Sequence, residues 1–134
     1  MGNSNGVCKI CNRNEETLCH LLFDCSQANN VWQNIEIYIL NKCGIHINLT
    51  KEIVLFGMNL DNKEIEIIVN LLIFETKWQI WKNRNCVKYG SKISFSYTQI
   101  FQNVLNEIKL LIGILRKGVL RDKCNLNTLC NFVN

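Results

Sequence analysis

Apolar side chains recur at helical spacing over much of the chain, and the first such segment begins just after residue 25. Its members, three or four residues apart, are Ala28, Val31, Trp32, Ile35 and Ile39. This spacing places them on one face of an α-helix. Ser26 is a candidate cap for the start of the helix. Gly44, at the position where many helices turn left-handed, predicts its end.

A longer helical pattern runs from about Lys63 to Asn85. Asp61 and Glu64 have the spacing of a capping box at its start. Its apolar members, expected broadly on one side, are Ile65, Ile68, Leu72, Trp78 and Trp81. The pattern therefore predicts a helix of several turns with one predominantly apolar side.

The clearest amphipathic pattern follows Ser96 and Gln99, which form a second capping-box pair. Its apolar members are Phe101, Val104, Leu105, Ile108, Leu111, Ile112 and Leu115. We expect this helix to end near Gly118. This is the pattern of an amphipathic helix, which packs by its apolar side.

Three segments show no such pattern. Residues 1–7 are polar and are expected to form a flexible lead. Glu52–Leu55 fits either a short helix or an extended segment that ends at Phe56-Gly57, and residues 120–134 remain undefined. No internal repeat and no low-complexity linker is evident, so the pattern favours three or four helices in one compact unit.

Composition supports a folded chain. It has 134 residues, of which 48% are hydrophobic and 19% charged, and it contains no Pro. This length and apolar content can form a real core. No signal-peptide pattern is seen, and no apolar run reaches the roughly 18 residues that span a bilayer. We therefore expect a soluble intracellular protein of the nucleus or cytoplasm with no membrane partner, where thiols stay reduced.

Charge is distributed unevenly. Through Asn70 there are five Lys and Arg against eight Asp and Glu, a balance of −3. From Leu71 onward there are ten against three, a balance of +7. A basic half can bind phosphate backbones. Solvated helix faces of a mildly basic protein explain the same numbers equally well.

Four of the five cysteines and histidines in residues 8–25 have metal-ligand spacing. Cys8, Cys11, His20 and Cys25 form the pattern C-x2-C-x8-H-x4-C. Thiolates and imidazole in this number suit a tetrahedral zinc ion, and a fully protein-ligated zinc is structural. Cys19 can replace His20 as a ligand, and all four can instead be unliganded core residues. The remaining candidates, which lack ligand spacing, are Cys43, Cys86, Cys124, Cys130 and His46.

The segment Cys8–Trp32 resembles the zinc-binding domain at the C-terminus of non-LTR (LINE-type) retrotransposon reverse transcriptases. That family reads C-x2-C, then E-T-x-x-H-L-F/L-x-x-C, then V-W, and this chain has Glu16-Thr17 through Cys25 and Val31-Trp32. Leu55-Phe56-Gly57 and Phe74–Arg84 resemble later motifs more loosely. The resemblance implies one structural Zn²⁺ held by the four ligands named above. It also implies a role beside nucleic acid in target-primed reverse transcription.

Polymerase chemistry is not expected. A polymerase needs paired carboxylates for two metal ions, and the three aspartates, Asp24, Asp61 and Asp122, are isolated. No nuclease-like cluster and no phosphate-binding Gly-rich loop is evident. The chain is therefore predicted to be a non-enzymatic C-terminal piece, a degenerate copy or a reused module of the family it resembles.

Together these patterns predict a mainly α fold, with a small CCHC zinc knuckle in residues 1–25 followed by a helical bundle in residues 26–134. The leading hypothesis is a nucleic-acid-binding accessory module whose contacts are Lys77, Trp81, Lys82, Arg84, Lys88 and Lys92. Trp78 or Trp81 would stack on an unpaired RNA or DNA base, whereas the competing interpretation places at least one of them in the core.

Two other hypotheses remain. In the first, zinc only joins the N-terminus to the bundle, and an apolar face of Phe101–Leu115 docks on a polymerase domain or another protein. In the second, the chain is an inert relic.

Overall fold

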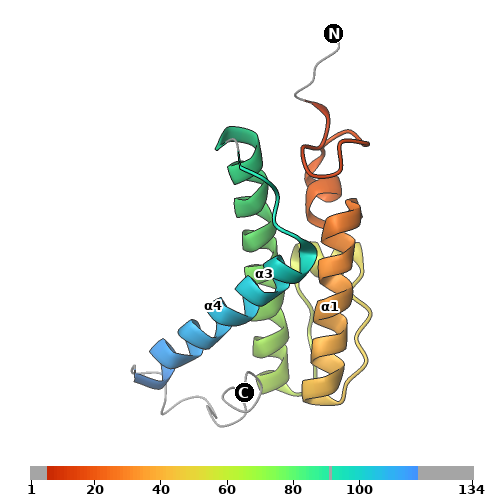
Figure 1. Ribbon diagram of the computed structural model, residues 1–134. Helices are drawn as coiled ribbons and strands as arrows, with labels where there is room; N and C mark the ends of the chain where they lie inside the picture. Colours follow the sequence, from red (N-terminus) through yellow and green to blue (C-terminus); the bar gives the residue numbers. More distant parts are fainter. Residues whose placement is uncertain (1–5, 91, 118–134) are drawn as a thin grey trace.

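The computed structural model describes residues 6–90 and 92–117 and confirms a mainly α fold with a Cys/His cluster at its N-terminal end (Figure 1). The described elements are the π-helical turn η2 (His20–Asp24), α1 (Ser26–Cys43), α2 (Lys51–Phe56), α3 (Lys63–Tyr89) and α4 (Tyr97–Lys117). Helices α1 and α3 run antiparallel, and α4 crosses them obliquely (Figure 1). Each of these three helices packs against the other two.

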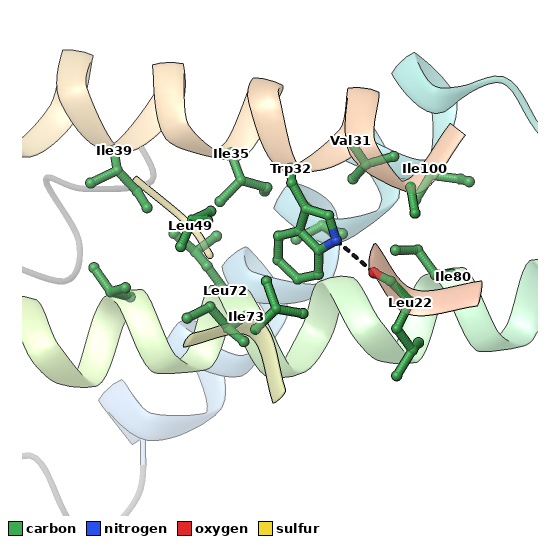
Figure 2. Packing of buried hydrophobic residues seen from close by; sticks show 14 of the residues in the cluster. Leu22, Val31, Trp32, Ile35, Ile39, Leu49, Leu72, Ile73, Ile80 and Ile100 are labelled. Atoms are coloured by element: carbon green, nitrogen blue, oxygen red, sulfur yellow. Dashed lines mark hydrogen bonds between the residues drawn. The ribbon is translucent and has the colours of Figure 1, made fainter. Parts of the chain in front are cut away.

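The core lies between α1, α3 and α4. Its largest fully buried side chains are Trp32, Ile35, Ile39, Ile68, Leu72, Ile73, Ile100 and Ile108. The indole of Trp32 points into this core, and its Nε1 donates to the Leu22 carbonyl at 2.7 Å (Figure 2). Leu21, Leu22 and the two cysteines Cys8 and Cys25 belong to the same buried cluster. The N-terminal segment is therefore part of the main core, and its packing depends on α1.

Three predicted helix ends are confirmed or corrected. Gly44 has φ +70° and its N–H bonds to the Leu40 carbonyl, as predicted. Ser96 caps α4 as predicted, since its Oγ accepts from Gln99 N at 3.2 Å. Ser26, however, is already helical and the N-cap residue of α1 is Cys25, which makes no side-chain cap.

Asn62, and not Asp61, caps α3. Its Oδ1 accepts from the backbone N–H groups of Glu64 at 3.0 Å and Ile65 at 3.2 Å. Asn and Asp are equally good caps, so the sequence did not separate the two adjacent positions. The ambiguous segment near residue 52 forms α2, which Thr50 caps by accepting from Ile53 N.

The prediction that five apolar residues share one side of α3 is partly wrong. Ile68 and Leu72 are buried, but Trp78 is 50% exposed and Trp81 is 38% exposed. Each residue turns a helix by about 100°, so Trp78 and Trp81 lie well away from the Leu72 face. The buried stripe of α3 continues instead through Thr76, Gln79, Ile80 and Asn83, three of which are polar. Thr76 tolerates burial because its Oγ1 donates to the Leu72 carbonyl at 2.7 Å.

None of the helices within the two described ranges combines the length and the apolar character that a membrane crossing requires. The predicted end of α4 at Gly118, and the cysteines Cys124 and Cys130, lie outside the described residues.

Candidate metal centre and basic helix

A tight loop brings Cys8 and Cys11 together. Val7 and Glu15 form an antiparallel bridge at the base of the loop, so the described end of the predicted flexible lead belongs to the folded unit. Within the loop, Cys8 N donates to the Asn14 carbonyl, and Asn12 N donates to the Cys8 carbonyl, each at 2.8 Å. Asn12 has φ +58°, a left-handed conformation that Asn tolerates better than most residues. This turn folds the chain back between the two cysteines.

The π-helical turn η2 positions the second pair of ligands. Cys25 N donates to the His20 carbonyl at 2.7 Å, which is the i→i+5 bond of a π-turn. In an α-helix, residues five apart would differ by about 500° and face different sides. The wider turn returns Cys25 to the side of His20. The His20 backbone is fixed as well, since its N–H donates to Thr17 Oγ1 at 3.0 Å.

These two elements bring all four predicted ligands to one place. One ligand atom from each of Cys8, Cys11, His20 and Cys25 lies within 4.8 Å of the others. Cys11 Sγ is 3.4 Å from His20 Nε2, and Cys8 Sγ is 4.0 Å from Cys25 Sγ. In a tetrahedral zinc site with bonds of about 2.3 Å to sulfur and about 2.0 Å to nitrogen, such edges measure about 3.5 and 3.8 Å. The donor set and its spacing therefore fit one metal ion.

The local environment shifts the pKa values of the Cys11 and Cys25 thiols in opposite directions. Burial raises the pKa of the Cys25 thiol to about 12. Burial also raises the pKa of Cys11, but hydrogen bonds from the Arg13 and Asn14 backbone and from His20 outweigh it and bring this pKa to about 6. Without a cation, Cys11 is thus readily a thiolate, whereas Cys25 retains its proton. A metal ion stabilises the thiolates and so offsets the cost of deprotonating the buried Cys25 thiol.

The other described cysteines and the second histidine lie outside the cluster. Cys19 directly precedes His20 and is half-buried, but it is not one of the four residues whose ligand atoms converge. Cys43 is half-buried, Cys86 is exposed and His46 is exposed. Among the described residues, the geometry selects the imidazole over the neighbouring thiol as the fourth donor.

A buried ion pair joins the loop to α3. Glu16 Oε1 accepts from both Nε of Arg84, at 3.0 Å, and Nη2 of Arg84. The two side chains are only 9% and 11% exposed. The hydrogen bond from Arg84 holds the pKa of the Glu16 carboxyl below its usual value. The Arg84 guanidinium also lies over the rings of Trp81 and Tyr89, with its carbon 5.3 and 5.8 Å from their centroids. This arrangement fixes the orientation of the knuckle on the helix.

The six residues predicted to contact nucleic acid have different surroundings. Lys82 and Lys92 are exposed, and Trp81 is partly exposed. Lys77 donates to the Leu55 carbonyl at 3.4 Å, and Lys88 Nζ is 5.3 Å from the Tyr89 ring centroid. Arg84 has a structural partner in Glu16, so its charge is already balanced. No local sequence pattern links these two residues, which are 68 positions apart.

A groove next to this helix was not predicted. It is lined by Leu18 and Leu22 from the knuckle and by Phe74, Lys77, Trp78 and Trp81 from α3. The i, i+4, i+7 spacing of its three aromatic residues was visible in the sequence. Grouping the two Trp with Ile68 and Leu72 on one side of the helix concealed it.

Comparisons with known proteins leave the site to be interpreted from its own geometry. No protein-family model matches this chain, and neither the curated proteins nor the solved structures include a significant match to it.

Proposed function

We propose that this protein is a non-catalytic zinc module that binds nucleic acid and is related to the C-terminal zinc-binding domain of non-LTR reverse transcriptases. The observation that carries the proposal is the attachment of a Cys₃His cluster, through the buried Glu16–Arg84 pair, to a basic helix with exposed tryptophans. The motif resemblance across Cys8–Trp32 supports the same assignment.

Zinc is the proposed metal because of the donors. Three thiolates and one imidazole are soft and borderline ligands, which favour Zn²⁺ over the oxygen-binding Mg²⁺ and Ca²⁺. Four protein ligands would leave no position for an activated water, so the ion would support structure and no hydrolysis. Cys8 and Cys25 are 0% and 1% exposed, which suits a closed structural site.

The charge of the C-terminal half of α3 supports a phosphate-containing partner. Residues 76–106 contain five Lys and Arg and no Asp or Glu. Arg84 is neutralised by Glu16, which leaves four lysines as candidates for phosphate contact: Lys77, Lys82, Lys88 and Lys92. Such contacts release counterions, so binding should weaken as salt rises.

Fluorescence anisotropy with labelled RNA and DNA tests this function. We expect binding at about 50 mM salt that weakens strongly by about 200 mM. A Lys82→Ala/Lys88→Ala double variant should reduce the slope of log affinity against log salt by roughly 1.4, since each single-strand phosphate contact contributes about 0.7. Lys109→Ala, which removes an exposed lysine from α4, is the matched control. Absence of binding at the lowest salt would refute the function.

One observation favours a protein partner as the second candidate. On α4, Leu110 is 62% exposed and Ile114, one turn later, is 66% exposed. Two large apolar side chains on one exposed face suit docking on another protein, such as a polymerase domain. Sedimentation velocity of the wild type and of Leu110→Ser/Ile114→Ser distinguishes self-association through this face from a monomer.

A further inference from the structure

The groove between the knuckle and α3 has the dimensions of a ligand site. Its volume is about 370 Å³, and its walls are the six residues named above, two from the knuckle and four from α3. Ligand pockets in proteins typically measure about 300–1,000 Å³. The groove is thus large enough for a flat ring system.

Its walls are unusually apolar for an exposed surface. Leu18 is 61% exposed, Phe74 64%, Trp78 50% and Trp81 38%. The three aromatic residues lie on adjacent turns of α3, and Leu18 faces them from the knuckle. Contiguous patches of large, exposed apolar side chains often mark binding sites.

The charges around the groove identify the partner. Lys77 is itself a wall residue, and Lys82 follows Trp81 directly on the exposed side of α3. The knuckle's Glu16, which would repel an anion, is neutralised by Arg84. An apolar peptide would satisfy the aromatic walls but would leave these cations unused. A nucleic acid strand uses both, since its bases stack on aromatic rings and its phosphates pair with lysines.

The two tryptophans are not equivalent. The Arg84 guanidinium already lies over the Trp81 ring, with its carbon 5.3 Å from the centroid. No such cation contact is found for Trp78 among the described residues. Trp78, at 50% exposure, is therefore the residue that can offer a ring face to a base.

We propose that this groove takes an unpaired base of single-stranded nucleic acid, stacked on Trp78, and that the metal centre holds the opposite wall in place. Leu18 lies between two ligands in sequence, Cys11 and His20, and the next residue of the wall, Leu22, lies between His20 and Cys25. Loss of the ion frees this wall. Bases within a duplex are paired and stacked, and they cannot enter the groove. This inference rests on the proposed nucleic-acid-binding function.

Binding of matched oligonucleotides of about 12 nucleotides tests the proposal, with single-stranded RNA, single-stranded DNA and duplex DNA as separate probes. Trp78→Ala should weaken single-strand binding by roughly 5- to 150-fold, the range found when one base–aromatic stack is lost. Trp78→Phe should retain most of the affinity because it keeps a ring. Duplex binding should change less than about twofold, and Ile37→Ala, an exposed apolar residue of α1, is the remote control. Chelation of the metal should lower single-strand affinity in the wild type more than in Trp78→Ala.

The outcomes separate the two claims. Equal affinity for single strands and duplex, unaffected by Trp78→Ala, would overturn the base-binding groove while the phosphate-binding function stands. Absence of binding to all three probes at low salt would overturn both. Because Trp78 is half exposed, its variants should melt within a few degrees of the wild type, which a thermal scan verifies.

Discussion

Removal of the proposed zinc ion with a chelator is expected to lower the free energy of unfolding by about 4 kcal/mol or more, relative to protein with free zinc at about a thousand times its dissociation constant. Two ligands, Cys8 and Cys25, belong to the same buried cluster as Trp32, so loss of the ion also loosens the packing against α1. The core between α1, α3 and α4 also contains many residues from the helices themselves, such as Val104 and Ile108. Helical circular dichroism should therefore persist at low temperature, with an earlier thermal transition.

Variants sharpen this prediction. Cys25→Ser should have the low stability of the zinc-free protein and should not respond to added zinc. Cys86→Ser removes an exposed thiol from α3 and should behave like the wild type. Identical melting curves of the wild type with and without chelator would contradict a structural role for the ion.

Breaking the ion pair between the knuckle and α3 should give the second largest effect. Glu16→Gln leaves the Arg84 charge buried without its counterion, and we expect a loss of about 2–4 kcal/mol in the free energy of unfolding. Arg84→Met should cost a similar amount, because Glu16 Oε2 is already buried without a hydrogen-bond partner among the described residues. Denaturant unfolding with zinc present measures both losses.

The double variant and a second ion pair provide the controls. Glu16→Gln/Arg84→Met removes both charges, so its loss should be clearly smaller than the sum of the two single losses. The Lys51–Asp24 pair also joins the knuckle to the helices, but its side chains are 40% and 46% exposed. Asp24→Asn should therefore cost less than about 1 kcal/mol. Strict additivity of the first pair would show that its two charges do not interact.

The convergence of the four candidate ligands could be predicted from sequence because it depends on short, local spacings. Short spacings between Cys8, Cys11, His20 and Cys25 limit how far their side chains can separate, and the structure brings all four together. The π-turn that brings His20 back to Cys25 was not predictable, because no residue pattern in the chain distinguishes it from an α-turn. The choice of His20 over Cys19 likewise depends on this turn.

Long-range contacts account for what the sequence did not predict. Arg84 was assigned to phosphate because a basic residue on a helix is usually solvated, and its burial depends on Glu16, far away in the chain. The tryptophans of α3 were grouped with Ile68 and Leu72 on one side of the helix, and one interpretation placed at least one of them in the core because large aromatic residues are usually buried. Buried Thr76 and Asn83 occupy that face instead, since their polar groups are hydrogen-bonded to the Leu72 carbonyl and to Ser94. Polar residues with specific partners can thus shift a helix face in a way that hydrophobic periodicity does not reveal.

The most direct test of the proposed metal centre is X-ray absorption at the zinc edge of the purified protein, combined with the zinc content per chain. The four converging donor atoms predict one zinc per chain, bound by three sulfur atoms at about 2.3 Å and one nitrogen atom at about 2.0 Å. His20→Ala should then lose the nitrogen contribution. Four sulfur ligands in the wild type, unchanged in His20→Ala, would place Cys19 in the site, and a chain purified without stoichiometric metal would contradict the centre altogether.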